Sequence, residues 1–68
     1  MNKIKINTEI IKLDAFLKWA AIVSSGSEAK IYIQDELVKV NNEICTQRGK
    51  KLKVGDIVSF EGSNFEII

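Results

Sequence analysis

Residues 13–40 are LDAFLKWAAIVSSGSEAKIYIQDELVKV, two helical patterns followed by the beginning of a strand pattern. The first pattern has the three- and four-residue spacing of an amphipathic helix, at Leu13, Phe16, Leu17, Ala20 and Val23. Ser25, followed three residues later by Glu28, forms a capping box that predicts a second helix, running to about Glu36. The apolar face of this helix is expected to carry Ala29, Tyr32, Ile33 and Leu37, so that the two helices can pack together.

Beyond the helices the period changes to the alternation of strands. Val38 and Val40 share one side of a short strand, Asn41-Asn42 suits a tight turn, and Ile44 lies on the returning arm. Residues 57–60 and 65–68, separated by a Glu-Gly-Ser-Asn turn, predict a final hairpin, and residues 3–6 alternate like an edge strand. The sequence therefore predicts an α+β fold of two short packed helices followed by a small, mainly antiparallel sheet.

The size and composition of the chain exclude several classes of protein. With 68 residues it is expected to be a single domain, residues 1–68, with one modest core. It contains no histidine and one cysteine, Cys45, so neither an internal disulfide nor a Cys/His zinc site can form. No paired catalytic acid and base stands out among the nine carboxylates. We expect a cytoplasmic protein that is not an enzyme, has no cofactor or metal, and does not enter a membrane.

A basic segment, residues 46–53, is the first candidate binding site. It is the least hydrophobic stretch of the chain and is expected to be a surface loop, with positive charges at Arg48, Lys50, Lys51 and Lys53. Such a cluster can neutralise phosphates and release counterions, which gives salt-sensitive binding without base specificity. The alternative is a solvated loop that only keeps the protein soluble.

The start of the second helix is the other candidate. Its first backbone amides, around Gly26, Ser27 and Glu28, lack partners within the helix and can bind an anion. Gly26 would let a ligand approach the backbone closely. The alternative is that Ser25 and Glu28 cap one another and that nothing binds.

The order of four segments resembles a known family. They are KLDAFLK at residues 12–18, SGSEAK at 25–30, VKVNNE at 38–43 and KLKVGDIV at 51–58. Together they resemble the S-four RNA-binding domain, named after small-subunit ribosomal protein four, and cover about residues 12–58. Small stand-alone bacterial members, with Ser-Gly-Gly-x-Ala-Lys and Arg-Arg-Gly-Arg-Lys-Leu segments, are similar to the stretches at residues 25–30 and 47–52.

The resemblance implies an αL type RNA-binding motif in which one face of the helix pair and the adjoining loops hold structured RNA, ribosomal or transfer RNA. Lys12 stands where the family favours arginine, Ser25 and Lys30 match its second helix, and Asn41 matches its hairpin. With the basic segment, the expected RNA-binding residues are Lys12, Lys18, Ser25, Gly26, Lys30, Asn41, Arg48, Lys50, Lys51 and Lys53. Two departures stand out: Gly26 replaces a common arginine, and Glu36 replaces the usual glycine before the hairpin.

Other residues favour structural roles, and other functions remain open. We expect Trp19 and Tyr32 to cover the core rather than stack on bases, and Asp56 to shape the turn before the last hairpin. Lys18 would share a surface with Lys30 only if the helices cross as they do in the family. The alternatives to RNA binding are a protein-interaction adaptor and an accessory subunit of an RNA-modifying enzyme.

Overall fold

The computed structural model describes all residues, 1–68. It contains nine short helices and strands joined by turns and loops. The helices are α1 (Leu13–Trp19) and α2 (Gly26–Gln34). The strands are β1 (Asn2–Ile4), β2 (Ile10–Lys12), β3 (Val38–Val40), β4 (Glu43–Ile44), β5 (Lys51–Lys53), β6 (Ile57–Phe60) and β7 (Ser63–Ile67). This order confirms the α+β fold predicted from the sequence.

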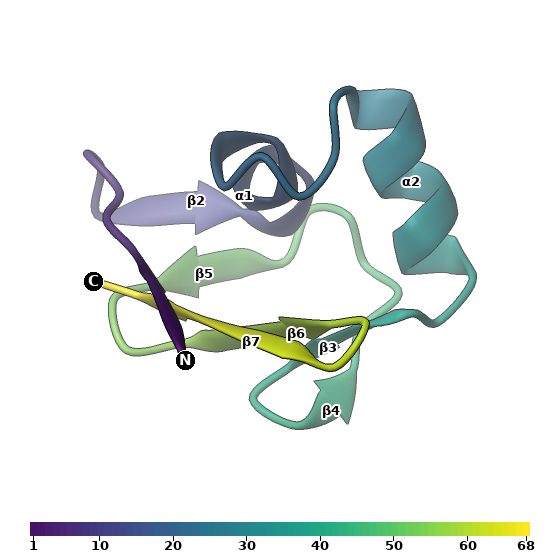
Figure 1. Ribbon diagram of the computed structural model, residues 1–68. Helices are drawn as coiled ribbons and strands as arrows, with labels where there is room; N and C mark the ends of the chain where they lie inside the picture. Colours follow the sequence, from purple (N-terminus) through teal and green to yellow (C-terminus); the bar gives the residue numbers. More distant parts are fainter.

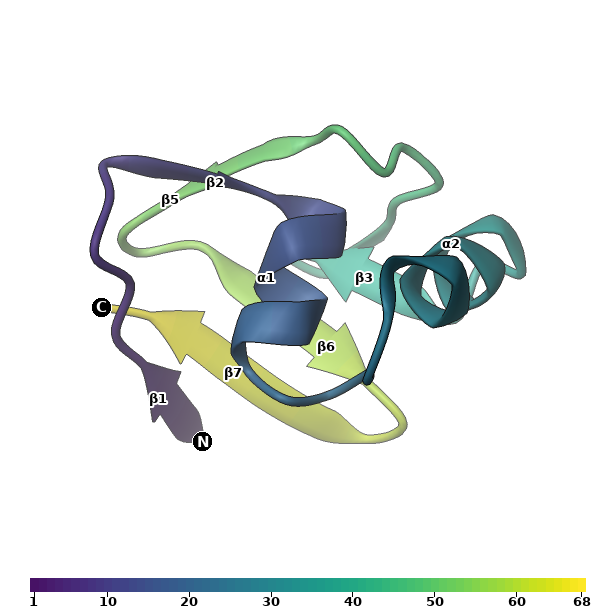
Figure 2. The ribbon, with the colours of Figure 1, turned by 90° about the horizontal axis from the view of Figure 1, so that it is seen from above.

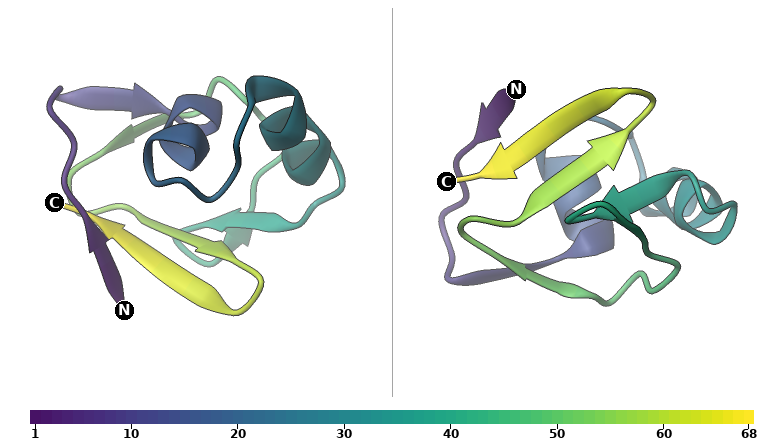
Figure 3. Two further views of the ribbon diagram at one scale, coloured as in Figure 1. Left: turned by 45° about the horizontal axis from the view of Figure 1, so that its top comes forward. Right: turned by 90° about the horizontal axis from the view of Figure 1, so that it is seen from below.

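The strands form two separate sheets. Five of them pair in the order β1-β7-β6-β3-β4, antiparallel except for the parallel pair β1–β7, and β2 pairs with β5 in an antiparallel ribbon. Both helices lie over one face of the five-stranded sheet, and α1 lies between the β2–β5 ribbon and α2 (Figure 1, Figure 2). The opposite face of the sheet carries no helix (Figure 3, right). Neither helix is long and apolar enough to span a bilayer.

The core lies between the helices and the sheets. Leu13, Phe16 and Leu17 of α1 are fully buried, at the positions that the helical spacing predicts. They pack with Ala29 and Ile33 of α2, and the strands contribute Val38, Leu52, Val58 and Ile67, all fully buried as well. The final hairpin and the expected edge strand near the N-terminus are confirmed, although β1 is Asn2–Ile4 rather than residues 3–6.

Both helices end earlier than their apolar patterns predict. Each ends in a Schellman motif: Ile22 N–H donates to Leu17 O after α1, and Leu37 N–H donates to Tyr32 O after α2. The motif places one residue in the left-handed region, here Ala21 at φ 58° and Glu36 at φ 61°. The predicted continuation of the first helix to Val23 is therefore wrong, and Leu37 is half-exposed beyond α2 instead of packing on its apolar face.

Glu36→Gly should stabilise the protein by about 0.5–1 kcal/mol, because glycine adopts a left-handed conformation without the cost that a side chain adds there. Urea denaturation would measure the gain. Glu36→Ala is the matched control, since it removes the same charge and keeps the β-carbon. Equal stability of the two variants would show that the backbone at this position is not strained.

The basic segment is not a loop throughout, which corrects the prediction for residues 46–53. Its last three residues form β5, and Leu52 is fully buried against the core. The partner strand β2 was not predicted, because three residues are too few for an alternating pattern to stand out. Only the part up to Lys50 remains a loop.

Candidate nucleic-acid interface

The basic loop is fastened to the start of α1. The residue before this helix is Lys12, and its side chain does not accept a capping hydrogen bond from the first turn. The backbone fills this gap: Leu13 N–H donates to Lys50 O at 2.9 Å, and Asp14 N–H donates to Arg48 O at 3.1 Å. Because these amides are orphan donors of the first turn, the helix start and the loop hold each other in place. The charges of the loop are thus carried on an ordered backbone.

The β2–β5 ribbon places lysines opposite one another. Its register pairs Lys12 with Lys51 and Ile10 with Lys53. Strand alternation buries Leu52, so these lysines all lie on the exposed outer side of the ribbon. We call Lys12, Lys51 and Lys53 the basic ribbon.

The pair Lys12–Lys51 is a close contact of like charges. The bond from Leu13 N–H to Lys50 O makes the next pair along, Lys12 with Lys51, a non-hydrogen-bonded one, with α-carbons about 4.5 Å apart. Like charges directly opposite each other destabilise a sheet. No acidic side chain lies within salt-bridge distance of either lysine, since the one salt bridge of the protein joins Lys53 to Asp56. Lys12 and Lys51 therefore carry positive charge that no salt bridge of the fold neutralises.

Four of the nine acidic residues lie in segments away from the ribbon, whereas Glu9, Asp14 and Asp56 lie close to the ends of its strands. Asp35 and Glu36 follow α2, Glu43 lies in β4, and Glu61 lies in the β6–β7 turn. These segments lie at the right of Figure 1, and the ribbon lies at the left. The ribbon and its loop carry five basic residues against the three acidic ones beside them, so this side keeps an excess of positive charge although the net charge is only +1.

Asp56 organises the turn next to the ribbon, as predicted. Asp56 is 7% exposed, and its carboxylate accepts bonds from Lys53 N–H at 3.0 Å and from the Asn41 amide at 3.1 Å. Burial acts to raise the pKa of Asp56, but the bonds from the Lys53 backbone, the Asn41 amide and the Lys53 ammonium outweigh it. The pKa is therefore lowered from its ordinary value of 3.8. Asp56 thus stays ionised and keeps the end of β5 in place.

Asn41 belongs to the same network. It has φ 51°, as the predicted turn requires, and its side-chain oxygen accepts a bond from Ile57 N–H at 2.9 Å. The side-chain nitrogen of Asn41 donates to Asp56, so both the oxygen and the nitrogen of the side-chain amide have partners inside the protein. The structure supplies a structural reason for Asn41 and none for an RNA contact.

At the start of α2, Ser25 caps Glu28 as expected from the sequence, but the Glu28 carboxylate bonds Ser24 instead of Ser25. Ser25 Oγ accepts from Glu28 N–H at 3.2 Å, and the Glu28 carboxylate reaches back to Ser24 N–H at 2.9 Å. Glu28 thus places a negative charge in the first turn, where it already interacts favourably with the helix dipole. Capping is a sufficient role for Ser25 and Glu28. An anion bound beside Gly26 would be repelled by the Glu28 carboxylate.

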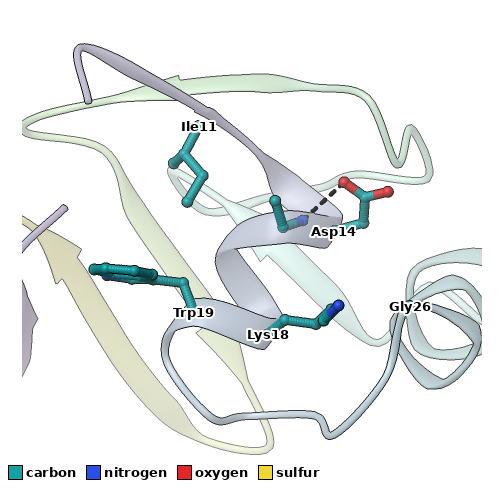
Figure 4. A pocket seen from close by; sticks show the side chains of 6 residues that line it. Ile11, Asp14, Lys18, Trp19 and Gly26 are labelled. Carbon is teal, nitrogen blue, oxygen red and sulfur yellow. Dashed lines mark hydrogen bonds between the residues drawn. The ribbon is translucent and has the colours of Figure 1, made fainter. Parts of the chain in front are cut away.

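A groove lies between α1 and the beginning of α2. It has a volume of about 570 Å³ and is lined by Ile11, Asp14, Ala15, Lys18, Trp19 and Gly26 (Figure 4).

Trp19 is 51% exposed, so the prediction that it covers the core is wrong. Tyr32 does pack against the core, and the centre of its ring lies 5.0 Å from that of Phe60. The helical spacing distinguishes these two aromatic residues, because Tyr32 lies on the predicted apolar face of its helix and Trp19 is not among the apolar positions of the first helix.

The remaining predicted residues are spread over the molecule. Lys50 lines a second hollow beside the β3–β4 hairpin, together with Asn41 and the acidic Glu43. Lys18 lies on the groove, and Lys30 is exposed on α2. The structure therefore gathers Lys12, Lys51 and Lys53 in one ribbon with Arg48 on the adjoining loop, and it places the others around this group.

Lys51→Glu should raise the stability of the protein by about 0.5 kcal/mol at low salt, because it converts a like-charge cross-strand pair into an opposite-charge pair. Thermal unfolding at two ionic strengths would show the gain and its screening by salt. Lys53→Glu is the contrasting variant, since it breaks the bond to Asp56 and should destabilise. A loss of stability from Lys51→Glu would mean that the two lysines do not repel each other.

The fold and this surface define a small domain with two helices on a sheet and a positively charged ribbon at one side. The chain belongs to the S4 domain family, whose profile matches residues 4–68; this is the S-four domain that the sequence resembles. It is 44% identical over 68 residues to RlbA of Bacillus subtilis (strain 168), described as a probable ribosome maturation protein, with 98% of this chain and 96% of that protein covered.

A solved structure has the same fold. The solution structure of YbcJ from E. coli, described as an αL motif involved in RNA binding, superposes with a TM-score of 0.72 at 28% identity. The match covers 100% of this chain and 87% of that one. The αL arrangement expected from the sequence resemblance is thus confirmed.

Proposed function

We propose that this protein is an RNA-binding module that acts on ribosomal RNA during ribosome maturation, without catalysis of its own. The observation that carries the proposal is the pair Lys12–Lys51, held opposite each other with no acidic partner. Such a pair costs stability in the free protein, and a phosphate between the two ammonium groups would remove the repulsion. Membership of the S4 domain family and the name of the RlbA relative support RNA as the partner and the ribosome as the setting.

The contacts would be made with the phosphate backbone of folded RNA. Lys12, Lys51 and Lys53 would bind phosphates along one strand, and Arg48 would extend the contact from the loop. Phosphate contacts fix position and carry no base information, so the rigid ribbon would select RNA by its shape. Lys18 and Lys30 would add contacts only to an RNA large enough to extend over the helices.

The RNA partner can be identified by incubating the immobilised protein with total cellular RNA and sequencing what is retained. Ribosomal RNA, enriched at a few defined positions, is the expected result, because a shape-selective surface should prefer particular folded sites. The Lys12→Glu, Lys51→Glu double variant serves as the control for adventitious retention. Enrichment of transfer RNA would change the proposed target, and retention equal to that of the double variant would reject the proposal.

A further inference from the structure

The exposed face of Trp19 is not used by the phosphate contacts of the basic ribbon. Large aromatic side chains usually contribute their apolar surface to the core of a small domain. Trp19 is instead half-exposed at the C-terminal end of α1, on the wall of the groove described above (Figure 4). A ring exposed on the wall of a groove can therefore take a flat ligand.

The indole ring is held in a defined position. Its Nε1–H donates to Lys5 O at 2.8 Å, so the segment that follows β1 fixes one edge of the ring. The bond involves only the edge of the ring, the side chain stays 51% exposed, and Ile11 and Ala15 add apolar surface to the same groove. A planar ligand can thus stack on a ring that is already ordered, which reduces the entropy lost on binding.

The charges around the groove favour a base attached to a nucleic-acid backbone. Lys18 lies in the lining and has no acidic partner within salt-bridge distance, so it can bind a phosphate at the rim. Asp14, also in the lining, repels a phosphate placed inside the groove but tolerates the neutral ring of a base. The groove and the basic ribbon share β2, but Ile11 faces the groove and Lys12, the next residue, points to the opposite side of the strand, so an RNA would have to pass over β2 to reach both.

We propose that the groove holds one unpaired base of the bound RNA, stacked on Trp19, with Lys18 on the adjoining phosphate. The inference rests on the proposed RNA binding and adds a place for a nucleotide that leaves the RNA stack. Bases extruded from loops and bulges commonly stack on aromatic side chains, and such stacking tolerates any base. The protein would then prefer RNA with a bulge or loop next to a helical segment.

Trp19 is the only tryptophan of the chain, so its fluorescence reports directly on stacking. Titration of the intact protein with purified ribosomal RNA should quench this fluorescence, with a midpoint equal to that of binding measured by filter retention. Two variants form a matched pair: Trp19→Phe and Trp19→Leu both lose the bond to Lys5 O and differ in the aromatic face. Trp19→Leu should bind RNA about 10-fold more weakly than Trp19→Phe, the effect of one base stack.

The outcomes separate this inference from the function on which it rests. RNA that binds in a salt-sensitive manner, with unchanged fluorescence and equal affinity for both variants, would overturn the stacked base and leave RNA binding intact. An absence of RNA binding would overturn both. The quenching experiment needs no substitution, so it decides the question even if a Trp19 variant fails to fold.

Discussion

Replacing Lys12 and Lys51 together by glutamate should lower the affinity for RNA on the order of 100-fold at physiological salt. The change removes two phosphate contacts and brings two carboxylates toward the RNA backbone. It should have little effect on the fold, because two opposed carboxylates repel each other much as two opposed ammonium groups do, and both positions are exposed. Filter retention with ribosomal RNA measures the affinity, and thermal unfolding checks the fold.

The matched control for this variant is Lys3→Glu with Lys39→Glu, which changes the net charge equally. Lys3 pairs with Glu66, and Lys39 lies between Ile44 and Ser59, both in the five-stranded sheet and away from the ribbon. The affinity of this control should fall by much less. Equal losses in the two double variants would mean that overall charge, rather than the basic ribbon, governs the binding.

Asp56→Ala should lower the free energy of unfolding by about 2 kcal/mol, because it leaves Lys53 N–H and the Asn41 amide without their buried acceptor. For a domain of this size the expected fall in Tm is about 10 °C. Asp35→Ala is the control: it removes an exposed carboxylate at the end of α2 that makes no side-chain hydrogen bond. This control should stay within about 0.5 kcal/mol of the native protein.

The loss caused by Asp56→Ala should also depend on pH. The pKa of Asp56 is lowered in the folded protein, so its carboxylate contributes its full stabilisation above the ordinary value of 3.8. The contribution is lost as the pH falls through the lowered pKa of the folded state. The difference in unfolding free energy between the native protein and Asp56→Ala should therefore be constant near neutral pH and shrink in strong acid. A difference that does not change with pH would show that the ionised form gives no advantage.

The structural features that several residues specify together were predictable from the sequence. The spacing of Leu13, Phe16 and Leu17 gave the buried face of α1, and Ser25 with Glu28 gave the start of α2. The helix ends were not predictable from apolar spacing, because Ala21 and Glu36 take left-handed conformations that neither residue type favours. Tertiary packing and the Schellman bonds overcame the local preference there.

The candidate site was predictable in composition but not in arrangement. Four basic residues in residues 48–53 indicated a phosphate-binding segment, yet only the pairing of β2 with β5 places Lys12 opposite Lys51. That pair is a long-range contact between two three-residue strands, too short for any periodic signal. The exposure of Trp19 agrees with its place off the apolar face of α1, but the groove that it shares with Ile11 and Gly26 could be found only in the structure.

The salt dependence of RNA binding tests the basic ribbon most directly. The logarithm of the association constant for ribosomal RNA should fall linearly with the logarithm of salt concentration, because each phosphate contact releases counterions. With Lys12 and Lys51 both replaced by glutamate, the slope should be shallower by about 2, one unit for each lost contact. Parallel slopes for the native protein and the double variant would contradict the account, because they would place the phosphates elsewhere on the molecule.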